Sequence, residues 1–320
     1  MKIVVLDGYV LNPGDLSWEG FSDLAELTVY DRTSYTDKDE IISRIGDAEI
    51  ILTNKTPIDA EVVAACPNLQ YVGVLATGYN VVDLAACSER KIVVTNVPAY
   101  STESVAQATF ALLLEICSQV GLHQQAVQAG EWQNCIDFSF TKHPLMELNG
   151  KVFGMVGFGQ IAQATAKIAH AFGMKVIFYN HQPKTFSEEW LTQVSLAELY
   201  QQADIISLHV PQTPETTQMI NQTALQAMKK SAILLNTARG GLVEEAALAE
   251  ALNSGKLRAA GLDVVSVEPI AADNPLLTAK NCYITPHIAW APTEARQRLM
   301  AIAVSNVQAF IDSQTQNQVN

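Results

Sequence analysis

Three ionisable side chains of different types, Arg239, Glu268 and His287, each follow a segment whose apolar pattern predicts a strand. The strands expected before them cover residues 232–236, 261–264 and 283–285. Arginine presents a planar fork that matches a carboxylate, and histidine can donate or accept a proton near neutral pH. Ligands of open parallel sheets bind beyond the carboxyl ends of the strands, so we expect these groups to converge there. Together they could hold a small carboxylate and protonate an oxygen atom next to it.

Each of these residues also has a purely structural interpretation. Arg239 alone could form a structural ion pair, Glu268 before a proline could be a solvated loop acid, and His287 could cap a turn. His209, at the end of another expected strand, could be a packed and hydrogen-bonded histidine. Their joint position at strand ends of one sheet, beyond a glycine turn, favours the functional interpretation.

The glycine turn lies within residues 152–162, which read Val-Phe-Gly-Met-Val-Gly-Phe-Gly-Gln-Ile-Ala. Apolar residues lead into the turn at strand spacing and leave it at helical spacing, which predicts the first half of a βαβ unit. Gly157 can adopt positive φ, and Gly159 lets a pyrophosphate approach the N–H groups at the start of the helix. Ala162 takes the third position, where only a small side chain is needed. Such turns also occur for packing alone, but the strand-then-helix context favours a dinucleotide site.

The end of the next expected strand, residues 174–179, bears on the type of dinucleotide. An acidic residue that binds the ribose is expected about 20 residues beyond the turn, and this chain has Asn180 there. An amide can bind a ribose hydroxyl without repelling a 2′-phosphate, and His181 and Lys184 stand close by in the sequence. No arginine is present there to clamp a phosphate. We expect NAD or NADP as the cofactor, with NAD slightly favoured.

A nicotinamide cofactor would give the three ionisable groups a common task. It supplies a hydride, while a cation must bind the carboxylate of a 2-keto acid and polarise its carbonyl group. An acid must then protonate the carbonyl oxygen. Arg239 suits the first role and His287 the second.

The composition argues against several other functions. The chain has 320 residues, 48% of them hydrophobic, which is enough for two domains with their own cores. The net charge of −13 argues against nucleic acid or a membrane as a partner. The N-terminus turns polar too soon for a signal peptide, and no apolar run is long enough to cross a bilayer, so a cytoplasmic location is expected. The five cysteines are scattered, so we expect buried thiols and no metal site.

Short apolar runs alternate with helical patterns along the chain, which predicts an α/β fold with doubly wound parallel sheets. In the first region the expected strands cover residues 3–6, 27–30, 50–53, 71–75 and 92–95, and the expected helices cover residues 39–47, 59–65 and 81–90. In the second region the expected strands cover residues 152–156, 175–179, 205–209, 232–236, 261–264 and 283–285. Residues 1–99 and 291–320 are expected to form a substrate domain, and residues 100–290 a dinucleotide-binding domain.

The segments between and after these regions are predicted as follows. A helix runs from Ser101 through Cys117, where the chain crosses between the domains. Residues 130–151 are irregular, and their aromatic side chains are expected to cover a neighbouring surface, which could belong to a partner subunit. These aromatic residues are Trp132, Phe138 and Phe140. A last helix covers residues 293–311, and the tail after Ser313, rich in Gln and Asn, is expected to fray.

The chain resembles the D-2-hydroxyacid dehydrogenases over nearly its whole length, and among them the glycerate dehydrogenase or hydroxypyruvate reductase branch. The motifs that carry the resemblance cover residues 73–83, the Gly157 turn, residues 208–216, residues 236–241, residues 261–264 with Glu268-Pro269, and residues 286–290. The resemblance implies a Rossmann-type cofactor domain and a flavodoxin-like substrate domain with a cleft between them. It also implies a homodimer built through the cofactor domain.

The resemblance assigns roles to individual residues. It implies that Arg239 binds the substrate, that His287 is the catalytic acid and base, and that Glu268 pairs with His287. It implies that the backbone of one turn binds the substrate carboxylate. This turn contains Leu75, Ala76, Thr77 and Gly78. From its residues alone, a turn that serves only the packing of the fold is equally possible. From the glycine turn, the strand ends and the resemblance, the residues expected at the cofactor are Thr102, Val105, Gly157, Gly159, Gln160, Ile161, Asn180, His181, His209, Val210, Pro211, Thr216, Thr237, Ala238, Asp263 and Ala289. Ala162 and Asn180 depart from the family pattern.

The expected reaction is hydride transfer from NAD(P)H to hydroxypyruvate or glyoxylate, giving D-glycerate or glycolate. His287 would donate the proton, Glu268 would favour the imidazolium by its charge, and Arg239 would oppose the build-up of negative charge. Two alternatives remain. One is a dinucleotide-sensing protein similar to the co-repressors that share this fold, and the other is a dehydrogenase of another small anion such as phosphite or formate.

Overall fold

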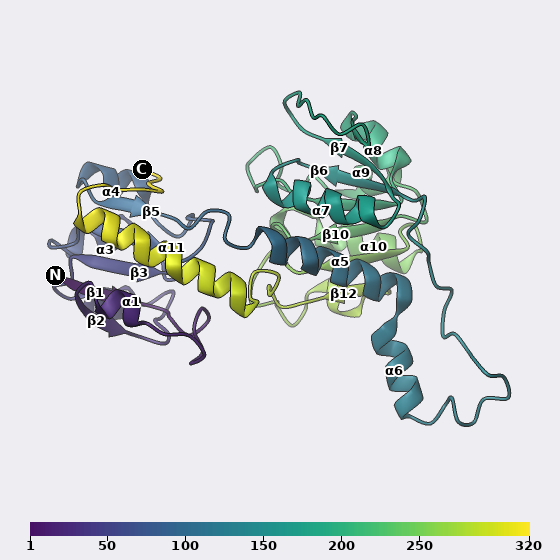
Figure 1. Ribbon diagram of the computed structural model, residues 1–320, viewed down its shortest axis with the longest axis horizontal. Helices are drawn as coiled ribbons and strands as arrows, with labels where there is room; N and C mark the ends of the chain where they lie inside the picture. Colours follow the sequence, from purple (N-terminus) through teal and green to yellow (C-terminus); the bar gives the residue numbers. More distant parts are fainter. The chain divides into compact units, whose positions relative to one another are not determined.

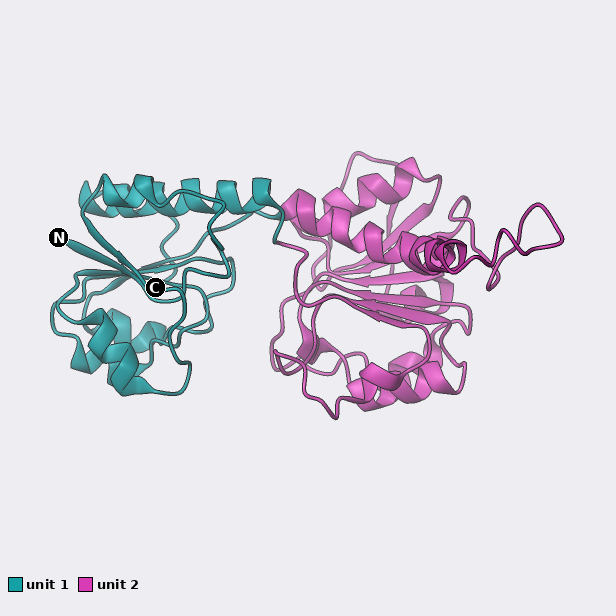
Figure 2. Ribbon diagram, turned by 90° about the horizontal axis from the view of Figure 1, so that it is seen from below, with its two compact units in different colours: residues 1–101, 291–320 teal, residues 102–290 magenta.

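The computed structural model describes all 320 residues, and the chain forms two compact units (Figure 2). Unit 1 contains residues 1–101 and 291–320, and unit 2 contains residues 102–290. Each unit is built on one sheet in which every pair of neighbouring strands is parallel. The predicted fold class, two doubly wound parallel-sheet domains, is confirmed.

The sheet of unit 1 has the strand order β2-β1-β3-β4-β5, which is the flavodoxin-like order. Its strands are β1 (Lys2–Val5), β2 (Glu26–Val29), β3 (Ile50–Thr53), β4 (Tyr71–Val74) and β5 (Val93–Thr95). Its helices are α1 (Glu19–Ser22), α2 (Lys38–Ile45), α3 (Ala60–Ala65), α4 (Leu84–Glu89) and α11 (Thr293–Ile311). An aspartate side chain caps the start of each of α2, α3 and α4: Asp37, Asp59 and Asp83.

Helices cover both faces of this sheet because successive strand residues point to opposite sides. On β4, Val72 and Val74 pack in a buried cluster with residues of α2, α3 and α4. Tyr71 instead contacts the ring of Phe310 on α11, with ring centroids 4.8 Å apart. The long helix α11 lies on one side of the sheet, with α1 beside it, and α2, α3 and α4 lie on the other side (Figure 2).

The C-terminal tail is ordered against β5, so the expectation that it frays was wrong. The N–H group of Val319 donates to the carbonyl oxygen of Val94 at 2.9 Å, and the N–H group of Val94 donates to Oδ1 of Asn320 at 2.9 Å. Gln318 forms an antiparallel bridge with Thr95. An edge strand presents unpaired backbone groups, and the tail satisfies those of β5.

The sheet of unit 2 has the strand order β12-β11-β10-β9-β6-β7-β8. Counted along the chain, this is the dinucleotide-binding order 3-2-1-4-5-6 with one more strand, and the order reverses between β6 and β9. The strands are β6 (Val152–Val156), β7 (Lys175–Tyr179), β8 (Leu191–Gln193), β9 (Ile205–Leu208), β10 (Ile233–Asn236), β11 (Ala259–Leu262) and β12 (Cys282–Ile284). The helices are α5 (Thr102–Ser118), α6 (Val120–Gln128), α7 (Gln160–Ala171), α8 (Leu196–Gln202), α9 (Gln222–Ala227) and α10 (Glu245–Asn253), with two short 3₁₀ helices, η1 (Gly240–Leu242) and η2 (Pro275–Thr278).

Two buried clusters lie on the two faces of this sheet. One contains Phe153 and Met155 of β6 together with residues of α5 and α7. The other contains Val156 of β6 together with residues of α8, α9 and α10. The alternation along β6 places the glycine turn at the end of a strand that is buried on both faces, as parallel sheets require.

Helix α6 and the loop that follows extend away from the sheet of unit 2 (Figure 1). Helix α6 was not predicted. The chain bends by 54° at Gln119, whose φ is 50°, and continues as a second helix. In the loop, the indole N–H of Trp132 donates to the carbonyl oxygen of Phe138 at 2.9 Å. Ile136 and Phe138 are 101% and 91% exposed. Within this chain, the apolar side chains at the tip of the loop therefore have no surface to cover.

By length and composition, no single helix could cross a membrane; α5 and α6 pass that test only as a pair, which is bent by 54°. All five cysteines are free. Three of them are buried as expected, but Cys135 and Cys282 are half-buried. Burial raises the pKa of the Cys282 thiol to about 12.

Candidate active site

The glycine turn between β6 and α7 combines a close contact with an open space. Gly157 has a φ of 90°, and a Cβ atom there would lie 2.7 Å from the carbonyl oxygen of His209. Around Gly159 nothing lies within 4 Å of the place of a Cβ atom, and no side chain caps the start of α7. The N–H groups of Gln160 and Ile161 in the first helical turn are therefore available to an anion. These residues fit the pyrophosphate of a dinucleotide.

His209 follows β9 and lies next to this turn. Its Nε2 atom is 2.9 Å from the hydroxyl oxygen of Ser207, and burial lowers the pKa of the imidazole to about 4. It is thus the packed, hydrogen-bonded histidine of the structural interpretation, and it is neutral at neutral pH. Beyond Val210, the hydroxyl group of Thr216 donates to the carbonyl oxygen of Pro211 at 2.7 Å and closes the loop.

The loop after β10 is held by Asn236, whose role was not predicted. This residue is 1% exposed; its Nδ2 atom donates to the carbonyl oxygen of Arg239 at 2.8 Å, and its Oδ1 atom accepts from the N–H group of Ala238 at 3.0 Å. Thr237 lies 3.0 Å from Thr109 of α5, hydroxyl to hydroxyl. In the sequence, the signal for this role was an amide residue at the end of an apolar strand, because a buried amide group needs hydrogen-bond partners.

Arg239 is exposed, and its guanidinium donates only to the carbonyl oxygen of Ala238, at 2.7 Å. The structural ion pair that the sequence left open is not formed, so the charge remains available for an anion. The next residue, Gly240, permits a close approach: a Cβ atom there would lie 1.9 Å from the carbonyl carbon of Val265. This contact sets the Arg239 loop against the segment that leads to Glu268.

Glu268 and His287 form a pair. The Nδ1 atom of His287 lies 2.7 Å from Oε2 of Glu268, and the two side chains are 31% and 34% exposed, His287 first. The other carboxylate oxygen accepts from the N–H group of Val265 at 3.2 Å. With Nδ1 facing the carboxylate, Nε2 is the ring nitrogen that can exchange a proton with a ligand.

Asp263 holds the segment that carries His287. This residue is 2% exposed, and its carboxylate accepts hydrogen bonds from the hydroxyl group of Thr285 at 2.6 Å and from the N–H groups of Ile288 and Ala289 at 2.9 and 2.8 Å. His287 has a φ of 54°, which is uncommon outside glycine, and its N–H group donates to the carbonyl oxygen of Asp263 at 2.8 Å. The structure thus gives Asp263 a positioning role; its contact with the cofactor stays a prediction.

The three ionisable residues start from one edge of the sheet. Strands β10, β11 and β12 are neighbours, with Asn236 beside Leu262 and Leu262 beside Ile284. The loops that carry Arg239, Glu268 and His287 leave directly from the carboxyl ends of these strands. The three residues therefore follow neighbouring strands of one sheet, as predicted.

Other predicted residues lie as follows. Thr102 begins α5, and Val105 in its first turn is 7% exposed. Asn180 and His181 follow β7, and Nδ2 of Asn180 donates to the carbonyl oxygen of Gln182 at 2.9 Å. The fold of unit 2 determines where these residues lie, and their contacts with a cofactor stay predictions.

In unit 1, the turn after β4 contains Leu75, Ala76, Thr77 and Gly78. The hydroxyl group of Thr77 donates to the carbonyl oxygen of Val97 at 2.9 Å, and the N–H group of Val97 donates to the carbonyl oxygen of Ala76 at 3.0 Å. These bonds fix the turn, while the N–H groups of Thr77 and Gly78 donate to no carbonyl of the chain. The turn can therefore bind an anion through its backbone.

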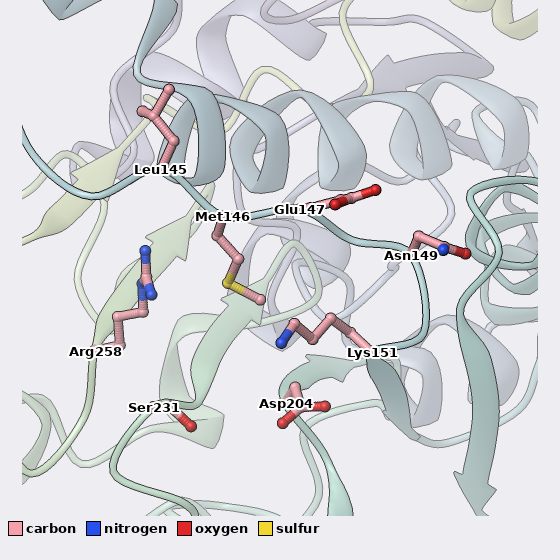
Figure 3. Close-up of a pocket in the computed structure, with 8 residues that line it drawn as sticks. All are labelled: Leu145, Met146, Glu147, Asn149, Lys151, Asp204, Ser231 and Arg258. Atoms are coloured by element: carbon pink, nitrogen blue, oxygen red, sulfur yellow. The ribbon is translucent and has the colours of Figure 1, made fainter. Parts of the chain in front are cut away.

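A hollow of about 330 Å³ lies at the opposite edge of the unit 2 sheet, where strands begin (Figure 3). Its lining comes from Leu145, Met146, Glu147, Asn149, Lys151, Asp204, Ser231 and Arg258. None of the predicted site residues contributes to it, so it is separate from the candidate active site.

Comparison with known proteins shows the family of the chain. Residues 110–289 match the family model for the D-isomer specific 2-hydroxyacid dehydrogenase, NAD binding domain. A hydroxypyruvate reductase of Blautia hydrogenotrophica is 56% identical over 100% of both chains. A glycerate dehydrogenase of Methylorubrum extorquens is 38% identical over 99% of this chain and 98% of its own. Among solved structures, the TT0316 protein from Thermus thermophilus covers 100% of both chains with a TM-score of 0.88 and 36% identity. The chain belongs to the D-isomer specific 2-hydroxyacid dehydrogenases and is an oxidoreductase that binds NAD or NADP.

Proposed function

We propose that this protein reduces hydroxypyruvate or glyoxylate, giving D-glycerate or glycolate. The observation that carries the proposal is the Glu268–His287 pair at 2.7 Å, on the same sheet edge as an arginine without an ion pair. The names of similar proteins support the substrate class. They include the hydroxypyruvate reductase and the glycerate dehydrogenase above, and a glyoxylate reductase of Korarchaeum cryptofilum that is 38% identical over 89% of this chain.

In the proposed mechanism, His287 protonates the carbonyl oxygen of the keto acid through Nε2. Glu268 accepts the hydrogen bond from Nδ1 and so fixes the orientation and tautomer of the ring. Arg239 binds the substrate and stabilises the negative charge that develops on the carbonyl oxygen. Asp263 and Asn236 hold the two loops that carry these side chains. The bound nicotinamide supplies the hydride.

We assign dinucleotide binding to unit 2 and binding of the substrate carboxylate to the turn of unit 1. In unit 2 the residues that would hold the cofactor are those of the glycine turn, the strand ends after β7, β9, β10 and β11, the start of α5, and Ala289. In unit 1 the backbone N–H groups of Ala76, Thr77 and Gly78 would bind the carboxylate, whereas that of Leu75 already donates to the carbonyl oxygen of Thr53 at 2.8 Å. A cytoplasmic location stays a prediction.

We also propose a homodimer that forms through unit 2. The exposed apolar side chains at the tip of the loop after α6, Ile136 and Phe138, support this arrangement because they have no partner within the chain. A second copy of the chain is the occupant that we propose for this surface.

A substrate panel tests the proposed function. NADH and NADPH oxidation is measured with hydroxypyruvate, glyoxylate and pyruvate, and reduction of NAD and NADP with phosphite and formate. We expect kcat/KM for hydroxypyruvate to exceed that for pyruvate by about tenfold or more, since a site that hydrogen-bonds the substrate hydroxyl rejects an analogue that lacks it. Turnover of phosphite or formate alone would identify another dehydrogenase, and cofactor binding without any turnover would identify a sensing protein.

A further inference from the structure

The segment between β7 and β8, residues 180–190, is packed against the glycine turn by three aromatic rings. Phe158, the middle residue of the turn, stacks on Phe178 with centroids 4.0 Å apart. Phe186 meets both rings edge-on, at 5.0 and 5.7 Å. Phe158 is only 1% exposed. Because aromatic side chains in such contacts are well fixed, the segment has a defined position relative to the turn.

Gln193 on β8 organises the backbone of the same segment. Its Nε2 atom donates to the carbonyl oxygens of Asn180 and Gln182, at 3.2 Å each. Its Oε1 atom accepts from the N–H group of Lys184 at 2.9 Å. One side chain therefore holds the ribose-side residue, Asn180, and the nearest lysine in a single arrangement.

The ammonium group of Lys184 lies beside the glycine turn. Its Nζ atom donates to the carbonyl oxygen of Phe158 at 2.8 Å. That acceptor is neutral, and an ammonium group has three donors, so a positive charge and further N–H groups remain for an anion. The acidic residues of the segment, Glu188 and Glu189, are exposed and form no ion pair with Lys184.

Asn180 completes the arrangement. In this fold the residue after the second strand lies beside the ribose hydroxyls, and an acidic residue there would repel a 2′-phosphate. Asn180 carries no charge, and its Nδ2 atom is already bound to the carbonyl oxygen of Gln182. The glycine turn thus has a cation without an ion pair beside it, and the residue expected at the ribose carries no carboxylate.

We infer that Lys184 selects the cofactor: its ammonium group binds the 2′-phosphate of NADPH, and the protein prefers NADPH to NADH. This reverses the slight preference for NAD that the sequence suggested, and it rests on the proposed dinucleotide site of unit 2. The pyrophosphate is the other anion that Lys184 could meet, but NADH and NADPH share it. Binding of the two cofactors therefore distinguishes the two contacts.

The test measures dissociation constants directly, without turnover. NADPH and NADH are titrated against the full-length protein by fluorescence of the reduced nicotinamide, and adenosine 2′,5′-bisphosphate and 5′-AMP are used as competitors. We expect the wild type to bind NADPH and the bisphosphate more tightly. Lys184→Gln should weaken NADPH binding by about 10- to 100-fold, the size of one charge-assisted hydrogen bond, and leave NADH within about twofold. Lys184→Arg should retain most of the preference.

Lys230→Gln serves as the matched control, since Lys230 is an exposed lysine of unit 2 outside the cofactor site. An equal loss of NADPH and NADH in Lys184→Gln would place the contact at the pyrophosphate and overturn the inference. Unchanged constants, or a wild type that prefers NADH, would overturn it as well. A wild type that binds neither cofactor would instead contradict the proposed function, so the two failures are distinguishable.

Discussion

The Nδ1 atom of His287 contacts the carboxylate of Glu268, which leaves Nε2 as the proton donor. A substitution of His287 should therefore lower kcat. His287→Asn removes the proton donor but keeps a hydrogen-bonding side chain. We expect kcat to fall by about 10²- to 10⁴-fold, the usual contribution of general acid catalysis, with the cofactor dissociation constant unchanged. Steady-state kinetics and a nicotinamide fluorescence titration measure the two quantities. A kcat within about threefold of the wild type would rule out His287 as the acid.

His209 gives a pH-dependent contribution to stability. Burial lowers its pKa from the usual value of 6.5 to about 4, so it is neutral in the folded protein. Between these two values the unfolded chain binds more protons than the folded one, and stability therefore falls as the pH decreases through this window.

We expect the free energy of unfolding to drop by about 1–3 kcal/mol more in the wild type than in His209→Gln between about pH 7 and pH 4.5. Urea denaturation at several pH values measures this difference. His143→Gln, a change at an exposed histidine, should behave as the wild type. Parallel pH profiles for wild type and His209→Gln would contradict the prediction.

At the scale of elements, the loops that carry the chemistry are held by buried polar groups. Asp263→Asn keeps the shape of the side chain but replaces one acceptor by an N–H₂ group that faces backbone donors. We expect a loss of about 1–3 kcal/mol in unfolding free energy, because a buried hydrogen bond is broken, and a lower kcat through misplacement of His287. Chemical denaturation and steady-state kinetics measure both.

Asp23→Asn is a control at an exposed aspartate of unit 1, outside the proposed site and the proposed dimer surface. If Asp263→Asn weakened only cofactor binding, with stability and kcat at saturating cofactor unchanged, Asp263 would act by direct cofactor contact and not by positioning.

The sequence predicted those elements whose pattern is local. Strands β3, β6 and β7 and helix α11 have the predicted bounds. The glycine turn and the strand-end positions of Arg239 and His287 were predicted because side-chain chemistry and apolar spacing are both visible in the sequence.

The remaining features depend on contacts between distant residues. The C-terminal tail is polar and contains no periodic pattern, yet it pairs with β5, which lies more than 200 residues earlier. Helix α6 was missed because the chain bends at one residue, Gln119, whose type does not indicate a turn. The roles of Asn236 and Asp263 became visible only with their hydrogen-bond partners, since a polar residue at a strand end has many interpretations.

At the scale of the whole molecule, the exposed tip of the loop after α6 predicts the oligomeric state. We expect the wild type to have twice the 34.8 kDa mass of the chain in light scattering coupled to gel filtration. Ile136→Lys combined with Phe138→Lys should shift the protein to the monomer at micromolar concentration, because charged groups replace the apolar contact. Val10→Lys, at an exposed valine of unit 1, is the control. A monomeric wild type would contradict the homodimer.

Unit 1 is built from both ends of the sequence, and this affects how the protein folds during synthesis on the ribosome. Its sheet requires α11, which contacts β4 through Phe310, and the tail that pairs with β5. These parts emerge last, whereas unit 2 is one continuous segment. Since domains fold as they leave the exit tunnel, we expect unit 2 to complete its core first. When unit 2 has left the tunnel and residues 291–320 have not, we expect a nascent chain with one complete unit and a second unit whose sheet still lacks α11 and the C-terminal tail.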